Sequence, residues 1–155
     1  MITTRDLMAD DWRAWRDVRL AALSTDPGAY GSRYADWMDA DEARWRSRIE
    51  DVELTVLLEL DGFPVGVVCL AHDAAGPELI SLWVAPQARG AGAGDAAVRH
   101  IVQRAADLHP GEPVVLHVKK TNGAAQRLYA RNGFVVDGPN PADPSELRMH
   151  HRAAV

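Results

Sequence analysis

The sequence has one cysteine, no long apolar run and no signal-peptide pattern in its first residues, and each of these features argues against a class of protein. Cys69 alone can form neither an internal disulfide nor a cysteine-based metal site, and its place in the apolar run VGVVCL predicts a buried thiol. No apolar run approaches the roughly 20 residues of a membrane-spanning helix. The opening MITTRDLMADDW lacks the basic and apolar regions of a signal peptide. We therefore expect a cytoplasmic protein with no membrane partner.

The chain also has fewer basic than acidic residues. The chain has 17 Lys and Arg against 22 Asp and Glu, a net charge of −5, which argues against a nucleic-acid partner because such proteins present a basic face. Its six histidines show no metal-ligand spacing, and the adjacent His150 and His151 would point to opposite faces of a strand. No metal is expected. With 155 residues, 47% of them hydrophobic, the chain 1–155 is predicted to be a single globular domain.

Strand and helix patterns alternate along the chain. Two apolar runs on either side of Asp61-Gly62 predict a β-hairpin, and Asp39 followed by Glu42 resembles a helix capping box. The second half reads strand, helix, strand, helix, strand, which implies a parallel crossover. The sheet should therefore be mixed, in an α/β (α+β) fold. The predicted strands are ITTRDL, ELTVLLEL, FPVGVVCLAH, ELISLWVAP, PVVLHV, FVV and ELRMHH.

Three glycines within five positions, in VAPQARGAGAGDAAV, stand between a predicted strand and a predicted helix. Backbone N–H groups at such a junction, together with the helix dipole, can bind an anion. A nucleotide-triphosphatase loop is excluded because Gly94 is followed by Asp95 rather than Lys. The spacing does not fit a dinucleotide fingerprint either. Lys119 and Lys120 leave an NADP-binding variant open, and a turn without any ligand is the other alternative.

A second motif downstream decides between these alternatives. The glycine loop follows the pattern Q/R-x-x-G-x-G/A with Gln87, Arg89, Gly90 and Gly92, continued by Gly94. The second motif consists of Asn122, Ala125, Leu128, Tyr129, Gly133 and Phe134. In this order and spacing, over about residues 54 to 137, the sequence resembles the GNAT superfamily of acetyl-CoA-dependent N-acetyltransferases.

The resemblance implies a fold and a co-substrate. It implies a central mixed, mostly antiparallel twisted β-sheet flanked by α-helices, with two splayed strands that hold acetyl-CoA. The pantetheine arm would pair with the strand before the glycine loop, and the loop would hold the pyrophosphate. The implied cofactor-binding residues are Leu82, Trp83, Val84, Gln87, Arg89, Gly90, Ala91, Gly92, Ala93, Gly94, Asn122 and Tyr129.

The resemblance also implies an acyltransferase mechanism in which an amine attacks the thioester directly in a ternary complex. Tyr129 stands where the family's phenol protonates the leaving thiolate, and Glu78 stands where some members carry the general base. Other members relay the proton through water, and His117 is a second candidate for the base. The backbone N–H of about Val84 is the implied oxyanion donor.

The acceptor is expected to be a primary amine of a small molecule or peptide. Tyr30, Tyr34, Asp36 and Trp37 fall in the segment that forms a wall of the acceptor site in this family, and an aromatic, acidic wall suits an aliphatic or cationic amine. A homodimer is compatible with the resemblance. The alternative function is a non-catalytic acyl-CoA-binding sensor or regulatory module, against which the retained Tyr129 argues.

Overall fold

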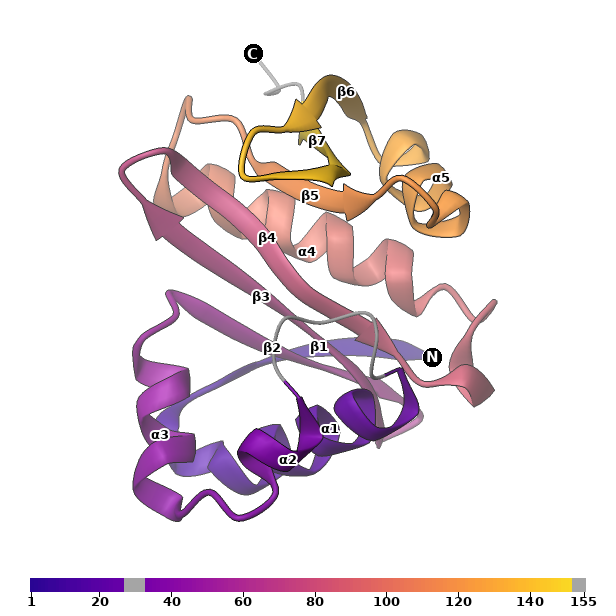
Figure 1. Cartoon of the computed structure of the whole chain (residues 1–155). Helices are drawn as coiled ribbons and strands as arrows, with labels where there is room; N and C mark the ends of the chain where they lie inside the picture. Colours follow the sequence, from indigo (N-terminus) through magenta and orange to yellow (C-terminus); the bar gives the residue numbers. More distant parts are fainter. Residues whose placement is uncertain (27–32, 152–155) are drawn as a thin grey trace.

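The computed structural model describes residues 1–26 and 33–151, which form a seven-stranded sheet with helices on both faces (Figure 1). The strand order is β1-β2-β3-β4-β5-β7-β6, and every neighbouring pair is antiparallel except the parallel pair β4–β5. This confirms the expected mixed, mostly antiparallel sheet. Within these ranges no helix is both long enough and apolar enough to span a membrane. The elements are β1 (Ile2–Leu7), α1 (Trp12–Thr25), α2 (Tyr34–Trp37), α3 (Glu42–Glu50), β2 (Leu54–Leu60), β3 (Phe63–Asp73), β4 (Gly76–Val84), α4 (Ala93–Leu108), β5 (Val115–Lys119), α5 (Gly123–Arg131), β6 (Phe134–Asn140) and β7 (Asp143–His151).

Each face of the sheet has its own hydrophobic core. On one face, α4 and α5 bury a stripe that includes Ile101 and Tyr129 against the sheet. On the other face, α1 and α3 bury Trp15 and Trp45, at the helical spacing that places both on the inner sides of their helices. Cys69 is fully buried in this second core, as its apolar surroundings in the sequence predict. Alternate residues of the central strands supply both cores.

Local sequence signals predict the hairpin turn correctly and misplace one helix cap. Asp61 and Gly62 both have positive φ values, 51° and 86°, as a two-residue hairpin turn between β2 and β3 requires. The predicted cap of α3 was wrong: the cap is Asp41, whose carboxylate accepts a hydrogen bond from the Arg44 backbone N–H at 2.9 Å, instead of Asp39 paired with Glu42. Asp41 lies one residue before the helix, where its carboxylate reaches the free N–H groups of the first turn.

Strand β4 departs from regular geometry in two ways that shape the molecule. Within the described residues it pairs with β5 at one position, Glu78 opposite Val115, and the two strands then diverge, with α4 behind the gap (Figure 1). It also carries a β-bulge, where Ser81 has a φ of 59° and the register with β3 shifts.

The bulge reverses the side-chain alternation along β4. Leu82 packs on the face covered by α4, whereas Ile80 packs on the face covered by α1 and α3. Strict alternation would place Glu78, Ile80, Leu82 and Val84 on one face of the sheet, and this expectation is wrong because Ile80 and Leu82 lie on opposite faces. The extra residue at the bulge turns the side chains in the later part of the strand toward the opposite faces of the sheet.

Candidate active site

A cavity of about 710 Å³ opens where β4 and β5 diverge. Three segments form it: the end of β4, the glycine loop with the first turn of α4, and the inner side of α5. The lining residues are Asp26, Leu82, Trp83, Val84, Ala88, Arg89, Gly90, Gly92, Ala93, Gly94, Asp95, Asn122, Ala124, Ala125, Arg127, Leu128, Tyr129 and Arg131. Its size is in the range of cavities that hold a cofactor or a drug-sized molecule.

The glycine loop turns the chain from β4 into α4 by means of two left-handed residues. Gly90 and Gly92 each have a φ of 88°, and a Cβ atom at either position would meet no atom within 4 Å. These glycines are therefore required by backbone conformation and not by crowding within the protein. Gly94 has a different role, because a Cβ there would lie 3.0 Å from the Leu128 side chain of α5. It allows the start of α4 to approach α5 closely.

The loop is also tied to the end of α1. Arg89 donates from Nη2 to the Asp26 carboxylate at 3.0 Å and from Nε to the Val84 carbonyl at 3.0 Å. The Trp83 indole donates to the same Asp26 oxygen at 2.8 Å. The positive charge of the Arg89 guanidinium is thus paired with a carboxylate at the rim of the cavity.

Tyr129 lies on the inner side of α5, 8% exposed, with its ring edge-on to Phe134. Desolvation raises the pKa of its phenol to about 12, so the hydroxyl keeps its proton throughout the neutral range. Among the described residues, nothing forms a hydrogen bond with this hydroxyl. Tyr129, which lines the cavity, therefore carries a neutral hydroxyl group.

Glu78 and His117 meet on the opposite face of the sheet from α4. His117 Nδ1 lies 3.3 Å from a carboxylate oxygen of Glu78, with side-chain exposures of 24% and 32%. Glu78 comes from β4 and His117 from β5, so the pair bridges the two strands near the point where they begin to diverge. Neither residue lines the cavity. They form a proton-accepting pair with access to solvent.

Two arginines of α5 line the cavity and were missed by the sequence reasoning. Arg127 and Arg131 are four residues apart and so share one side of the helix, a spacing that could have revealed them. Arg131 forms two hydrogen bonds with Asp95 of α4, at 2.8 and 2.9 Å, and Asn132 adds a third at 2.8 Å. The hydrogen bonds from Arg131 are the main reason that the pKa of Asp95 falls to about 2. The negative charge of Asp95, near the start of α4, is thus balanced by the positive charge of Arg131.

Most of the predicted cofactor-binding residues line the cavity. Gln87 and Ala91 do not; both are exposed on the outer side of the loop. Asn122 lines it and also caps α5, accepting a hydrogen bond from the Ala125 backbone N–H at 3.1 Å.

The predicted acceptor wall is only partly described. Tyr30 lies outside the described residues. Trp37 packs against Trp45, at a centroid distance of 4.9 Å, and Asp36 accepts a hydrogen bond from the Arg33 backbone N–H. Their contacts show a role in packing and capping for these two residues, and their role toward an acceptor stays a prediction.

Comparison with known proteins agrees with this arrangement. The model of the acetyltransferase (GNAT) family matches residues 6–134. An uncharacterized N-acetyltransferase of Mycobacterium tuberculosis (strain H37Rv) is 32% identical over 138 residues, covering 86% of each chain.

Solved structures show the same fold at low identity. YncA of Salmonella typhimurium, a putative acetyltransferase solved with its cofactor acetyl-CoA, superposes with a TM-score of 0.76 at 18% identity over 100% of this chain and 95% of its own. The PaiA N-acetyltransferase of Thermoplasma acidophilum, solved with coenzyme A, superposes with a TM-score of 0.73 at 20% identity, covering 98% of this chain and 99% of its own. With the splayed strands, the glycine loop and the buried phenol, these matches show that the chain belongs to the acetyltransferase (GNAT) family and is an acyltransferase.

Proposed function

We propose that this protein transfers the acetyl group of acetyl-CoA to a primary amine of a small molecule or peptide, by direct attack within a ternary complex. The observation that carries the proposal is the cavity that joins the end of β4, the glycine loop and Tyr129. An acyl-CoA has an amide arm, a pyrophosphate and a thioester. The end of β4 can pair with the amide arm, the glycine loop can bind the pyrophosphate, and Tyr129 can act at the thioester.

The cofactor would lie across the open end of the divergent strands. The backbone of Trp83 and Val84 can pair with the amides of the pantetheine arm, because no ladder joins β4 to β5 beyond Glu78 in the described residues. The N–H groups of the glycine loop, at the positive end of the 16-residue helix α4, suit the pyrophosphate. Arg127 adds a positive charge to the same cavity.

Tyr129 is the proposed general acid. When the tetrahedral intermediate collapses, the carbon–sulfur bond breaks and the thiolate takes a proton from the phenol. The proton is available because burial keeps the pKa of Tyr129 at about 12. The proposed oxyanion donor is the backbone N–H of about Val84, in the strand that would hold the thioester.

Glu78 is the proposed general base, with His117 as its partner. An amine is protonated at neutral pH and must lose a proton before it can attack. The carboxylate of Glu78 can orient and stabilise the imidazole of His117, and the pair can take the proton through water. Its position on the face opposite α4 supports an acceptor that approaches from the side of α1 and α2.

The proposal is tested by turnover. Purified protein is incubated with acetyl-CoA and a panel of polyamines, amino acids, aminoglycosides and peptides, and released thiol and acetylated product are measured. Amine-dependent release of one thiol per acetylated product is expected. Saturable acetyl-CoA binding without acetylation of any amine would instead favour the acyl-CoA sensor. Absence of binding would contradict both.

A further inference from the structure

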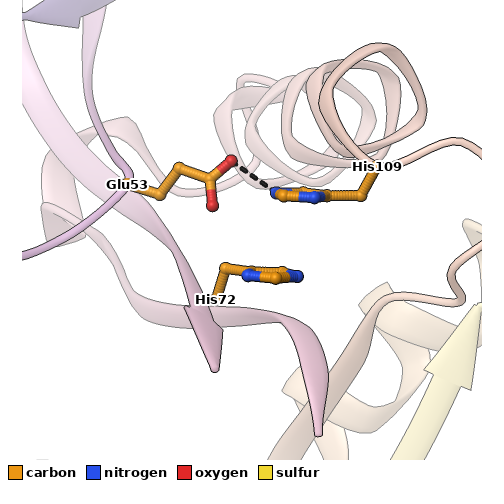
Figure 2. Close-up of side chains that lie close together, drawn as sticks. All are labelled: Glu53, His72 and His109. Atoms are coloured by element: carbon orange, nitrogen blue, oxygen red, sulfur yellow. Dashed lines mark hydrogen bonds and ion pairs between the residues drawn. The ribbon is translucent and has the colours of Figure 1, made fainter. Parts of the chain in front are cut away.

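Four side chains with metal-binding atoms gather at the end of the molecule away from the cavity. Glu53 precedes β2, His72 lies in β3, His109 follows α4 and Glu112 precedes β5. One ligand atom from each of Glu53, His72 and His109 lies within 4.8 Å of the other two. Figure 2 shows these three side chains side by side. These residues come from segments far apart in the sequence. That is why no spacing along the chain revealed the cluster.

We propose that this cluster binds one divalent transition-metal ion of the zinc class. The ion would take Nε2 of His72, Nδ1 of His109 and one oxygen of Glu112, with water as the fourth ligand. Two imidazoles and a carboxylate are a common donor set for such ions. Hard cations such as Mg²⁺ prefer all-oxygen sites. The proposal is independent of the acetyltransferase reaction.

The distances suit a four-coordinate ion. Metal–ligand bonds of about 2.1 Å at tetrahedral angles place the ligand atoms about 3.4 Å apart. A Glu112 carboxylate oxygen lies 3.4 Å from His109 Nδ1 and 3.5 Å from His72 Nε2. On the other side of the ring, His109 Nε2 lies 2.6 Å from Glu53. An ion takes one nitrogen of an imidazole, so it would bind His109 at Nδ1, beside Glu112. Glu53, on Nε2, would then orient the ring through its hydrogen bond.

One movement is needed for binding. The rings of His72 and His109 are stacked, with centroids 3.8 Å apart and planes within 2° (Figure 2). Nitrogen lone pairs lie in the ring plane, so two parallel rings do not aim at one point. Rotation of His72 about its side-chain torsions would bring the lone pairs together, and its 32% exposure leaves room for this.

An ion here would act as a structural clamp at the closed end of the divergent strands. His72 pairs with Pro77 of β4, next to the β4–β5 pairing of Glu78 with Val115. Glu112 lies three residues before Val115. The ion would thus join β3 to the chain entering β5, about 24 Å along α4 from the glycine loop. Its expected effect is on stability, because a ligand that binds the folded state raises the unfolding temperature.

The test is a titration of untagged, EDTA-treated protein with ZnCl₂, followed by calorimetry and thermal unfolding, with MgCl₂ as the comparison. We expect one Zn²⁺ per chain, a rise in Tm and no effect of Mg²⁺. His72→Gln and His109→Gln should each weaken binding at least about tenfold. His150→Gln, which removes a partly exposed histidine outside the cluster, should bind as the wild type does.

Co²⁺ spectroscopy of the wild type keeps the test independent of whether the variants fold. We expect visible absorption bands of the intensity typical of tetrahedral Co²⁺. They should saturate at one ion per chain and disappear when Zn²⁺ displaces Co²⁺. No saturable Zn²⁺ binding by the wild type would overturn the proposal. Equal binding by wild type and His72→Gln would overturn it as well, and would mean that the cluster is only a hydrogen-bonded clamp around His109.

Discussion

At the scale of single residues, the burial of Tyr129 has a direct chemical consequence. An exposed phenol begins to lose its proton near pH 10, whereas desolvation raises the pKa of this one to about 12. The proposed acid is therefore protonated at any pH at which the enzyme would work. The same burial places the ring against Phe134, so the side chain also contributes to the core.

Tyr129→Phe separates these two roles, because it removes the hydroxyl and keeps the ring. We expect kcat to fall about 100-fold, the range of general acid catalysis, while acetyl-CoA affinity changes less than about threefold. Steady-state kinetics and calorimetry measure the two quantities. A collapse of acetyl-CoA affinity with kcat unchanged would show that Tyr129 is structural and not the acid.

Glu78→Gln and His117→Gln test the proposed base. Each should lower kcat/KM at pH 7 by about tenfold or more, and the loss should shrink above about pH 9, where more of the amine is already deprotonated. Full pH–rate profiles of both variants make the comparison. If both profiles match that of the wild type at all pH values, the amine loses its proton without this pair.

At the scale of elements, the glycine loop combines a backbone requirement with a binding role. Gly92 and the hairpin residue Gly62 have nearly equal φ values, 88° and 86°, and at both positions a Cβ atom would stand in open space. Gly92→Ala and Gly62→Ala should therefore destabilise the fold by similar amounts, about 1 kcal/mol.

Only the first of these glycines lines the cavity. Gly92→Ala should therefore weaken acetyl-CoA binding about tenfold or more, with Gly62→Ala unchanged, because a methyl group would stand where the pyrophosphate approaches the backbone. Calorimetry on both variants decides this. Equal affinities would remove the loop from the proposed binding site.

Helices α4 and α5 are held together by the bidentate contact between Asp95 and Arg131. The pKa of Asp95 in the folded protein, about 2, is below its ordinary value of 3.8. Its stabilisation is therefore complete above about pH 4 and is lost as the pH falls toward 2.

Asp95→Asn should lower Tm at pH 7 by about 2–4 °C, the shift expected for about 1 kcal/mol in a domain of this size. The difference from the wild type should narrow as the pH falls from 4 to 2. Thermal unfolding across this pH range measures it. A Tm difference that stays constant down to pH 2 would contradict the assigned ionisation.

At the scale of the whole molecule, local patterns predicted much of the fold and of the cavity. Period-2 and period-3.6 patterns located the strands and helices, and the two motifs located the glycine loop and Tyr129. Contacts between distant segments were not predictable in this way. The pairing of Asp26 with Arg89 and the cluster around His109 join segments that only the folded chain brings together. The bulge at Ser81 carries no turn signal in the sequence, so strict alternation along β4 predicts the wrong face for Leu82 and Val84.

The central claim is that the divergent strands and the glycine loop form an acyl-CoA site. The most direct measurement is thermal unfolding of the wild-type protein with saturating acetyl-CoA, CoA, NADPH or ATP, since a ligand that binds only the folded state raises Tm with its saturation. Shifts with acetyl-CoA and CoA, and none with NADPH or ATP, are predicted. No shift with acetyl-CoA or CoA, or a larger one with NADPH, would contradict the account.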